Sequence, residues 1–561
     1  MGHNSGTPLP EAPGPRGGHY RSTATGLVLS LDEESEVALT NFTARVAARR
    51  TLDDGGATQT YLDLEADGPM GHSRFSVSPR EYERLSWISD HVPGGLIWPG
   101  VSKDHVRTAI TLLSAPEART TCTHLGWRQH EGRWVYLHAG GGIDENGSTA
   151  DLEVDVQAPL DRFALPPPPC GDDLVRTVRS SMEFLRLAPG RITVPLLAAV
   201  VLSVIEPGDF GLHIAATSGR GKSQIAAITS SFLASKISVG TDLPASWSST
   251  ANANQALAYS AKDSLLCVDD WVPGTKQGDE LTMDLLVRSQ GNGAGRARLG
   301  GKTFTPRGML LSTGEASPSR PSLLARLLVL RLGDQLDWER LTHAQNHARQ
   351  GTHAATMAAF IQWLAPRRDD VRERHAALVA EHRHTFDLEG LHRRTSDAIG
   401  RCFGALNALA DWMCEVEVLS PTKRRSFLAV VEDRLRACAH DQLEVQIAQD
   451  PAALFLARLR GAITSGDAHI SGRGPAVGSR IGFDRDGTPM LDPSAALRVA
   501  RSGEPAEALA ISPRCLGSAL HARGALARVD TRGDRVRFQI RVVEPGGGER
   551  RLVWALAPGV L

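Results

Sequence analysis

The sequence has no excess of charge of either sign, because its 62 lysines and arginines are matched by 63 aspartates and glutamates. Overall charge therefore cannot hold a nucleic acid, and any DNA contact must come from a local concentration of Arg and Lys. The seven cysteines include no C-x-x-C pair, which excludes the common zinc motifs and gives no sign of a disulfide framework. A reduced, cytoplasmic compartment fits this cysteine usage.

Long hydrophobic runs are also missing. The most apolar stretch, Ile192 to Ile205, is shorter than the roughly 20 residues that a bilayer requires, so it predicts a buried helix. The N-terminus is rich in Gly and Pro and has no apolar h-region, which argues against a signal peptide. We expect a disordered tail over residues 1–23 and no membrane partner.

The pattern changes along the chain. Short segments between Gly, Asp and Asn turns predict strands up to four consecutive prolines, Pro166 to Pro169, which force extended backbone and mark a boundary. Beyond it, short apolar strands alternate with helical patterns, as in an α/β sheet covered on both faces. The expected organisation is a disordered tail (1–23), a β-rich N-terminal domain (24–165), a P-loop α/β core (171–334), a helical lid region (335–450) and a winged-helix-like C-terminal domain (451–561).

The segment "ATSGRGKS", Ala216 to Ser223, predicts a phosphate-binding loop. It follows the strand-like "GLHIA" and precedes a helical pattern, so backbone N–H groups and a helix N-terminus converge on one point. Lys222 is expected to reach the β- and γ-phosphates of ATP, and Ser223 to coordinate Mg²⁺. Ala216 replaces the first glycine of the motif, which is tolerable only if its φ is negative. The alternative is a turn that happens to contain Gly-Lys-Ser. The predicted nucleotide-binding residues of this segment are Ser218, Gly219, Arg220, Gly221, Lys222, Ser223 and Gln224.

Two later apolar strands end in polar residues of the kind that a nucleotide site needs. "DSLLCVDDW" ends in Asp269, expected to hold Mg²⁺ through its water shell, and Asp270, expected to activate water. Asp270 is one methylene shorter than the Glu often found there. "GMLLST" carries Ser312 or Thr313 at its tip, either of which is a candidate γ-phosphate sensor. The alternative for the acidic pair is a solvated strand end.

Arg326 lies inside the apolar, strand-like "SLLARLLVLRL". A buried cation needs a partner, and ATP bound to a neighbouring subunit would supply one. This makes Arg326 a candidate arginine finger. The alternative is an ion pair with a local carboxylate.

A Gly-Gly pair between short alternating runs predicts a hairpin in "RARLGGKTFT". The hairpin carries Arg296, Arg298 and Lys302 with no acid among them. On an ATPase ring it would bind the phosphate backbone of single-stranded DNA. The alternative is an ordinary solvated hairpin.

The C-terminus gives a weaker nucleic-acid signal. A helix with Arg514, His521 and Arg523 is followed by a hairpin that turns after Arg532, which is typical of a winged helix. Such a helix can enter the DNA major groove, or the module can pack against protein. Both interpretations stay open.

Several longer segments resemble a known family. "SWSSTANANQALAYSAKDSLLCVDDW", "RSQGNGAGRAR" and "RGMLLSTGE" look like the AAA+ ATPase core of domain-of-unknown-function 927 proteins, and "HLGWRQHEGRWVYLHAGGGI" looks like the region that precedes that core. The resemblance covers roughly residues 41–330. Proteins of this family occur on phages, plasmids and integrated elements, and are similar to superfamily-3-type and MCM-like replicative helicases.

The resemblance implies an ATP- and Mg²⁺-dependent DNA helicase or translocase that serves replication of a mobile element. It implies a homo-oligomer, expected to be a hexamer, acting on single-stranded or forked DNA. Priming would require a separate primase, because no primase active site is recognisable in the first 165 residues. The competing function is a DNA-binding or assembly factor switched by nucleotide with little or no turnover. A third is a P-loop scaffold within a replication or defence complex.

The resemblance also assigns roles to residues. Lys222 and Ser223 carry over as the phosphate and Mg²⁺ residues, the two aspartates as the acidic pair, and Ser312 or Thr313 as the sensor. "SLLARLL" is similar to the finger segment of MCM-type ATPases, which supports Arg326. Arg393 or Arg394, in "GLHRRTSDAIG", is expected to be a second sensor. Ala216 and Asp270 are the two departures from the family pattern.

Overall fold

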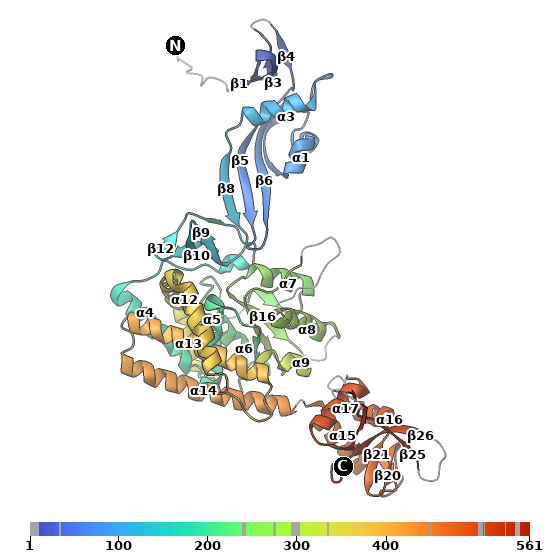
Figure 1. Cartoon of the computed structure of the whole chain (residues 1–561). Coiled ribbons are helices and arrows are strands. Elements are labelled where there is room, and N and C mark those ends of the chain that lie inside the picture. Colours follow the sequence, from blue (N-terminus) through green and yellow to red (C-terminus); the bar gives the residue numbers. More distant parts are fainter. Residues whose placement is uncertain are drawn as a thin grey trace. The chain divides into compact units, whose positions relative to one another are not determined.

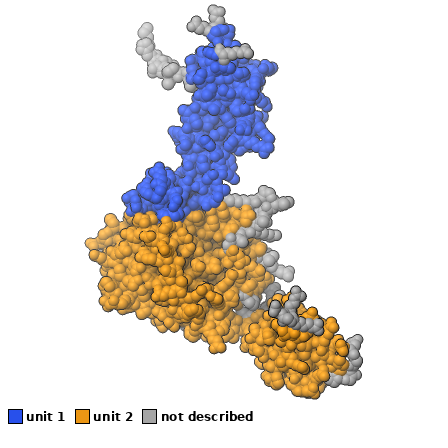
Figure 2. All heavy atoms as spheres, in the orientation of Figure 1, with its two compact units in different colours: residues 1–161 blue, residues 162–561 orange. Residues whose placement is uncertain are grey.

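The computed structural model describes residues 11–32, 35–237, 243–272, 277–292, 303–333, 336–448, 450–502, 509, 511–532, 535–544 and 550–561. Two compact units divide the chain, Met1–Asp161 (unit 1) and Arg162–Leu561 (unit 2), as Figure 2 shows by colour. The mixture of strands and helices confirms the α/β class, and the AAA+ and winged-helix assignments remain predictions.

Unit 1 consists mainly of β-structure (Figure 1). Its elements are β1 (Glu11–Pro13), η1 (Pro15–Gly17), β2 (His19–Ser22), β3 (Leu27–Ser30), β4 (Glu36–Ala38), β5 (Thr43–Asp53), β6 (Thr58–Gly68), β7 (Gly71–Val77), α1 (Pro79–Arg84), α2 (Trp87–His91), α3 (Lys103–Leu112), β8 (Glu117–Cys122), β9 (Gly126–His130), β10 (Arg133–His138), β11 (Gly141–Asp144), β12 (Gly147–Thr149), β13 (Glu153–Val154) and, at its end, η2 (Leu160–Arg162). They form sheets in the orders β1-β2-β3-β4, β13-β8-β5-β6-β7 and β12-β11-β10-β9.

The long β5–β6 hairpin forms because its turn satisfies its own backbone. Asp54 Oδ1 accepts hydrogen bonds from the N–H groups of Gly56 and Ala57, and Gly55 takes a φ of 74° that glycine adopts without strain. Secondary structure already begins at residue 11, inside the predicted disordered tail, which ran to residue 23. Tyr20 of β2 is 2% exposed and its hydroxyl bonds His105 on α3, so residues 11–22 are held by the fold of unit 1. Gly and Pro spacing concealed these short strands.

Unit 2 begins with a parallel sheet and its helices. The elements are α4 (Gly171–Met182), η3 (Glu183–Arg186), α5 (Gly190–Ile205), β14 (Gly211–Ala215), α6 (Lys222–Ser230), β15 (Ala245–Ser246), α7 (Ala251–Ser260), β16 (Leu265–Trp271), α8 (Gln277–Asn292), β17 (Met309–Gly314), α9 (Pro321–Leu324) and β18 (Leu327–Arg331). The strand order is β15-β16-β17-β14-β18, and every pairing is parallel. The first strand of the sheet, β14, therefore lies between the last two. Ligands bind beyond the carboxyl ends of such strands, where the order reverses.

The apolar run Ile192 to Ile205 is a buried helix, as predicted. Every residue from Ile192 to Ile205 in α5 is buried, including Thr193 and Ser203. A helix that is apolar all round must be covered all round. Among the described residues, no helix is both long and apolar enough to cross a membrane.

A helical region follows the sheet, with α10 (Trp338–Arg349), α11 (Thr352–Leu364), η4 (Ala365–Arg367), α12 (Arg368–Glu381), α13 (Arg393–Glu415) and α14 (Pro421–Ala448). The C-terminal part contains α15 (Pro451–Ser465), β19 (Ala468–Ser471), β20 (Ser479–Arg485), β21 (Thr488–Leu491), α16 (Pro493–Arg501), α17 (Pro513–Ala522), β22 (Leu526–Arg528), β23 (Asp530–Arg532), β24 (Arg535–Arg537), β25 (Ile540–Val543) and β26 (Arg550–Leu556). Its sheet has the order β19-β20-β21-β26-β22, with β25 also on β26 and β23 paired with β24. Phe455 and Trp554 lie in its separate hydrophobic core.

Candidate nucleotide site

The predicted phosphate loop connects β14 to α6. Gly219 and Gly221 have φ values of 80° and 83°, which require glycine for an unstrained backbone. Ala216 has no positive φ among the described backbone angles, its N–H donates to the Gly314 carbonyl at 3.1 Å, and its side chain is buried. The missing first glycine is therefore compatible with this loop, which meets the condition set by the sequence.

Two residues at the start of α6 have different surroundings. Lys222 is the first residue of the helix and is 8% exposed. Ser223 Oγ donates to Asp269 Oδ1 at 3.0 Å, so the hydroxyl and the carboxylate that the sequence assigned to Mg²⁺ lie in contact. Both offer the oxygen ligands that Mg²⁺ prefers. Within the described ranges, no three or more His, Cys, Asp or Glu side chains are grouped so that they could hold a metal ion. Mg²⁺ here would need oxygens from a nucleotide and water.

The acidic pair lies at an irregular end of β16. The pairing of β16 with β17 shifts register between Val268 and Trp271, and Asp270 has a φ of 65°. Thr313 Oγ1 donates to the Asp269 carboxylate and accepts the N–H of Asp270 at 3.0 Å. The Asp270 side chain is exposed. One threonine hydroxyl thus fixes the backbone of one aspartate and the carboxylate of the other.

The two predicted sensor residues lie in different environments. His213 Nε2–H donates to the Ala316 carbonyl at 2.9 Å, so Nδ1 accepts from the Ser312 hydroxyl at 2.9 Å. Trp247 Nε1–H donates to the same Ser312 oxygen at 2.9 Å. Burial lowers the pKa of His213 to about 4, so this network stays neutral. Ser312 belongs to the interior of the sheet, whereas Thr313 reaches the acidic pair.

The candidate arginine finger, Arg326, and the candidate second sensor, Arg394, both bond the end of α8, at the opposite edge of the sheet. The carbonyl of Arg326 accepts the N–H of Gly211, the first residue of β14, whereas the phosphate loop follows the last residue of that strand. Arg326 Nη2 donates to Asn292 Oδ1 at 2.9 Å and Nη1 to a backbone carbonyl, and its buried Nε has no partner. Arg394 Nη1 donates to the Gly291 carbonyl at 3.4 Å.

The surroundings of Arg326 do not compensate its positive charge. Partial burial lowers its pKa first, and the charges of Arg394 and Arg288 lower it further. Among the described residues it forms no ion pair, which disfavours the alternative of a local carboxylate partner. Arg394 was predicted among the residues that bind the cofactor, and the structure places it with Arg326 instead of with the loop.

The remaining predicted residues are placed as follows. Ser218, Gly219 and Arg220 are exposed in the loop, and Gln224 Oε1 accepts from Gln345 Nε2 at 2.6 Å. The predicted DNA-binding residues Arg296, Arg298 and Lys302 lie outside the described residues.

The start of α10 also adjoins the phosphate loop, which the sequence did not predict. A Cβ atom built on Gly221 would lie 2.4 Å from Leu336 Cδ2 and 3.6 Å from Trp338 Cη2, so both side chains adjoin the phosphate loop. Trp338 is 56% exposed, which is unusual for so large an apolar side chain. A tryptophan in a polar context shortly after the last apolar strand was the signal that could have identified it.

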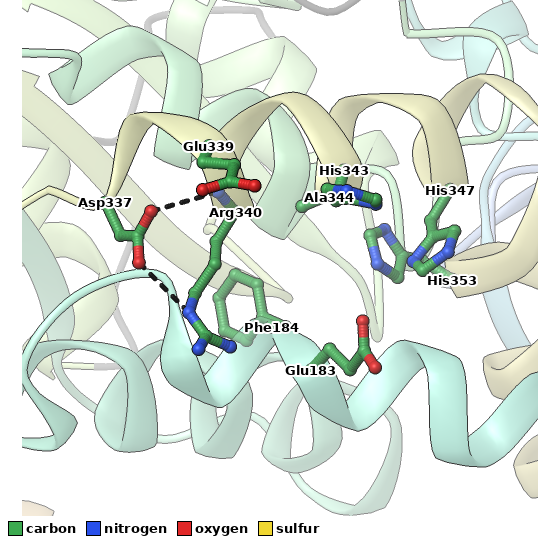
Figure 3. Close-up of a pocket in the computed structure, with 9 residues that line it drawn as sticks. All are labelled: Glu183, Phe184, Asp337, Glu339, Arg340, His343, Ala344, His347 and His353. Carbon is green, nitrogen blue, oxygen red and sulfur yellow. Dashed lines mark hydrogen bonds and ion pairs between the residues drawn. The ribbon is translucent and has the colours of Figure 1, made fainter.

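A cavity of about 290 Å³ lies beside this site and not within it. Figure 3 shows Asp337 and Arg340 joined at one end, and His343, His347 and His353 grouped towards the other. The Asp337 carboxylate accepts from both the backbone and the side chain of Arg340, each at 3.0 Å. None of the predicted phosphate-binding residues lines the cavity.

Comparisons with known proteins show one segment similar to a known domain and a fold similar to a solved structure. Residues 190–303, which contain the loop and the acidic pair, match the model of DUF927, a domain of unknown function. A solved structure described as "SCCmec type IV Cch - active helicase" shares 14% identity and a TM-score of 0.58, over 96% of this chain and 97% of that one. The C-terminal region of NrS-1 aligns at 8% identity over 68% of this chain and 85% of that chain, with a TM-score of 0.27. No curated protein sequence matches. The chain therefore contains a segment similar to DUF927, and its fold is similar to that of the solved helicase structure.

Proposed function

We propose that the chain is an ATP-dependent DNA helicase or translocase, with an AAA+ core that hydrolyses ATP at the subunit interfaces of a ring, in replication of a mobile element. The Asp269 carboxylate carries the proposal. It accepts hydrogen bonds from Ser223 at the start of α6 and Thr313 at the tip of β17. Loop helix, acidic strand and sensor strand therefore converge on one oxygen atom, as binding of a Mg²⁺–nucleotide requires. The helicase-like fold supports the proposal.

Each residue then has a defined task. Backbone N–H groups of the loop and the Lys222 ammonium bind the phosphates, and Ser223 and Asp269 hold Mg²⁺, which neutralises phosphate charge when it is bound. The exposed Asp270 carboxylate orients and deprotonates the attacking water. Thr313 keeps both aspartates in place.

The adenine base is assigned to Trp338. Its ring is exposed and adjoins the loop at Gly221, so its face is available for stacking. The Gln345–Gln224 hydrogen bond fixes α10 to α6 and hence the ring to the loop.

The arginines act on the ATP of a neighbouring subunit. Arg326 lies at the amino end of β14, which is five residues long, and the loop lies at the carboxyl end, roughly 15 Å away at about 3.3 Å per residue. A side chain at that distance does not reach its own phosphate loop. A ring arrangement brings Arg326 and Arg394 to the next site, where they stabilise the charge of the transferred phosphoryl group.

DNA binding in the ring is assigned to Arg296, Arg298 and Lys302, on the segment between α8 and β17. Changing Arg296 and Arg298 together to Ala removes two of these three cations. Stimulation of ATP hydrolysis by single-stranded DNA is expected to disappear in that variant.

One observation favours the second candidate, a nucleotide-dependent switch with little turnover. Asp270 has a φ of 65° on an irregular strand end, and its carboxylate is one methylene shorter than that of Glu. A water positioned by so short a side chain attacks the γ-phosphate less readily. The two functions share binding and assembly and differ in the rate of hydrolysis.

A strand-displacement assay on forked DNA distinguishes them. The wild type is expected to release the displaced strand with ATP, and not with a non-hydrolysable analogue. Lys222→Ala is expected to lose the activity, whereas Lys236→Ala, which removes an exposed lysine after the same helix, retains it. Nucleotide-dependent assembly without displacement would favour the switch. Displacement that is unchanged in Lys222→Ala would refute the proposed site.

A further inference from the structure

The C-terminal part of unit 2 contains a groove with a volume of about 1830 Å³. It is lined by the first turn of α17, the ends of β20 and β22, and strands β21, β23, β24, β25 and β26. All of these elements follow residue 478, so the groove belongs to the C-terminal part and not to the nucleotide site. The elements α17, β21, β25 and β26 are labelled in Figure 1.

Cations dominate the polar lining. Six arginines line the groove, against the acidic residues Asp486 and Asp530. Within the described part of the chain, only one of these arginines, Arg485, has a carboxylate within ion-pair distance, Asp486 at 4.0 Å. The side chains of the other five are exposed and have no hydrogen bond or ion pair to any described residue: Arg514, Arg528, Arg537, Arg541 and Arg550.

Most of the described arginines elsewhere in the same part of the chain are bonded. The set with carboxylate or carbonyl partners is Arg458, Arg460, Arg473, Arg480, Arg501, Arg523 and Arg551. Arg498, on α16, is exposed without a partner and does not line the groove. Unpaired charge is therefore concentrated in the groove. Guanidinium groups without internal partners are suited to phosphate, which they bind in a bidentate manner.

Between the cations lies apolar surface. Val536 and Leu552 are 40% and 48% exposed, and Phe538 contributes to the same lining. Phe538 packs on α17 because Gly517 has no side chain; a Cβ there would lie 2.7 Å from the Cβ of Phe538. Apolar surface beside unpaired arginines fits a polyanion with apolar faces, which describes a nucleic acid better than an acidic peptide.

The structure also restricts how α17 could contact DNA. Of the three cations that the sequence placed on this helix, Arg523 pairs with Asp450 and the ring of His521 packs against Phe538 at 5.6 Å between centroids. Arg514 alone lines the groove. The unpaired charge lies mainly on strands β22, β24, β25 and β26, so insertion of α17 into a major groove is not the contact that this surface favours.

We propose that this groove binds the phosphate backbone of DNA, independently of nucleotide and without sequence preference. The choice of DNA among polyanions rests on the proposed function; the binding of a polyanion does not. Five phosphate contacts to a duplex predict a slope of log affinity against log salt of about −4.5.

The test measures binding of the full chain to fluorescein-labelled 30-base-pair duplex and 30-nucleotide single strand by anisotropy, without nucleotide. The double variant Arg537→Ala/Arg541→Ala is expected to bind about 10–100-fold more weakly at 0.1 M salt, with the slope reduced by about 2. The matched control Arg498→Ala/Arg349→Ala removes the same charge from exposed positions outside the groove, and is expected to bind like wild type.

All four arginines are exposed, so both variants are expected to fold, and equal thermal melting checks this. Equal weakening by both double variants, or none by either, overturns the proposal. So does displacement of DNA by polyglutamate at matched charge concentration, which would assign the groove to an acidic protein. The outcome is separable from the proposed function. Lys222→Ala is expected to abolish ATP hydrolysis and leave this nucleotide-free binding unchanged, and the groove variant is expected to retain basal hydrolysis.

Discussion

At the scale of single residues, Asp269 is the centre of the site. Ser223 and Thr313 both donate to its Oδ1, and Thr313 also accepts from the backbone of Asp270. The chemistry therefore depends on a few hydroxyl and carboxyl groups whose positions are fixed by each other.

Replacing Asp270 by Asn is expected to preserve the fold and abolish turnover. Asn adopts a φ near 65° as readily as Asp, and its N–H still donates to Thr313. Without a carboxylate it cannot accept a proton from water, so the rate of ATP hydrolysis should fall about 10²–10⁴-fold while the Kd for ATP changes little. Single-turnover hydrolysis and ATP binding by fluorescence measure the two quantities. A rate within threefold of wild type would remove Asp270 from the chemistry.

Stability is expected to fall at acid pH because of His213. Its pKa is about 4 in the folded chain and about 6.5 when exposed, so the unfolded chain binds the proton first as the pH falls. The stability that neutral His213 contributes is thus complete above pH 6.5 and is lost progressively towards pH 4, by about 3 kcal/mol. His353, whose pKa burial lowers to about 3, acts in the same direction.

Urea unfolding at pH 7.5, 6 and 5 measures this dependence. His213→Asn should be less stable at pH 7.5 and show a smaller loss between pH 7.5 and pH 5. The control His343→Asn, at an exposed position, should retain the wild-type dependence. An identical pH dependence in wild type and His213→Asn would contradict the assignment.

At the scale of elements, periodicity and punctuation predict most of the core. The apolar runs predict β14, β16, β17 and β18, and the Gly-Lys-Ser turn predicts the start of α6. The choice between Ser312 and Thr313 could not be made, because neighbouring strand residues face opposite sides and the sequence does not say which side meets the site. The irregular end of β16 was equally hidden, since it depends on pairing with β17.

Contacts between elements far apart in the sequence were the other feature that the sequence could not predict. Arg326 and Arg394 were both predicted as cations near nucleotide. Their common position at the end of α8 depends on how α13 packs there, which the sequence does not show. Trp338 escaped notice for the same reason: only the packing of α10 on the loop brings it to Gly221.

Trp338→Ala tests the contact between α10 and the loop. Loss of the stacking surface should raise the KM for ATP about 5–20-fold, since base stacking on an aromatic ring contributes about 1–3 kcal/mol, with kcat changed less than twofold. Trp338→Phe retains an aromatic face and should recover most of the affinity. Steady-state hydrolysis across ATP concentrations checks both variants. An unchanged KM in Trp338→Ala would show that the adenine base does not stack on Trp338.

At the scale of the whole molecule, the account requires more than one subunit. The phosphate loop and Arg326 lie at opposite ends of β14, so the proposed site takes its loop from one subunit and its arginines from a neighbour. Complementation between defective subunits examines this directly.

Arg326→Ala and Lys222→Ala should each lose ATP hydrolysis alone and recover part of it when mixed. In the mixture, some interfaces combine an intact Lys222 with an intact Arg326 from the neighbour. Recovery of roughly a quarter of the wild-type rate is expected for random mixing in equal amounts, if interfaces act independently and the finger contributes about 10³-fold or more. Light scattering with an ATP analogue confirms that mixed rings form. Mixed rings without recovered activity would place both residues in one subunit's site.

The central claim, that this chain is a DNA-stimulated ATPase, is tested most directly by one measurement. The rate of ATP hydrolysis is measured with and without single-stranded DNA, for wild type and for Lys222→Ala. The account predicts hydrolysis by wild type that rises with DNA, and a rate at least about 100-fold lower in Lys222→Ala under both conditions, because Lys222 binds the phosphates directly. Equal rates for wild type and Lys222→Ala would contradict it.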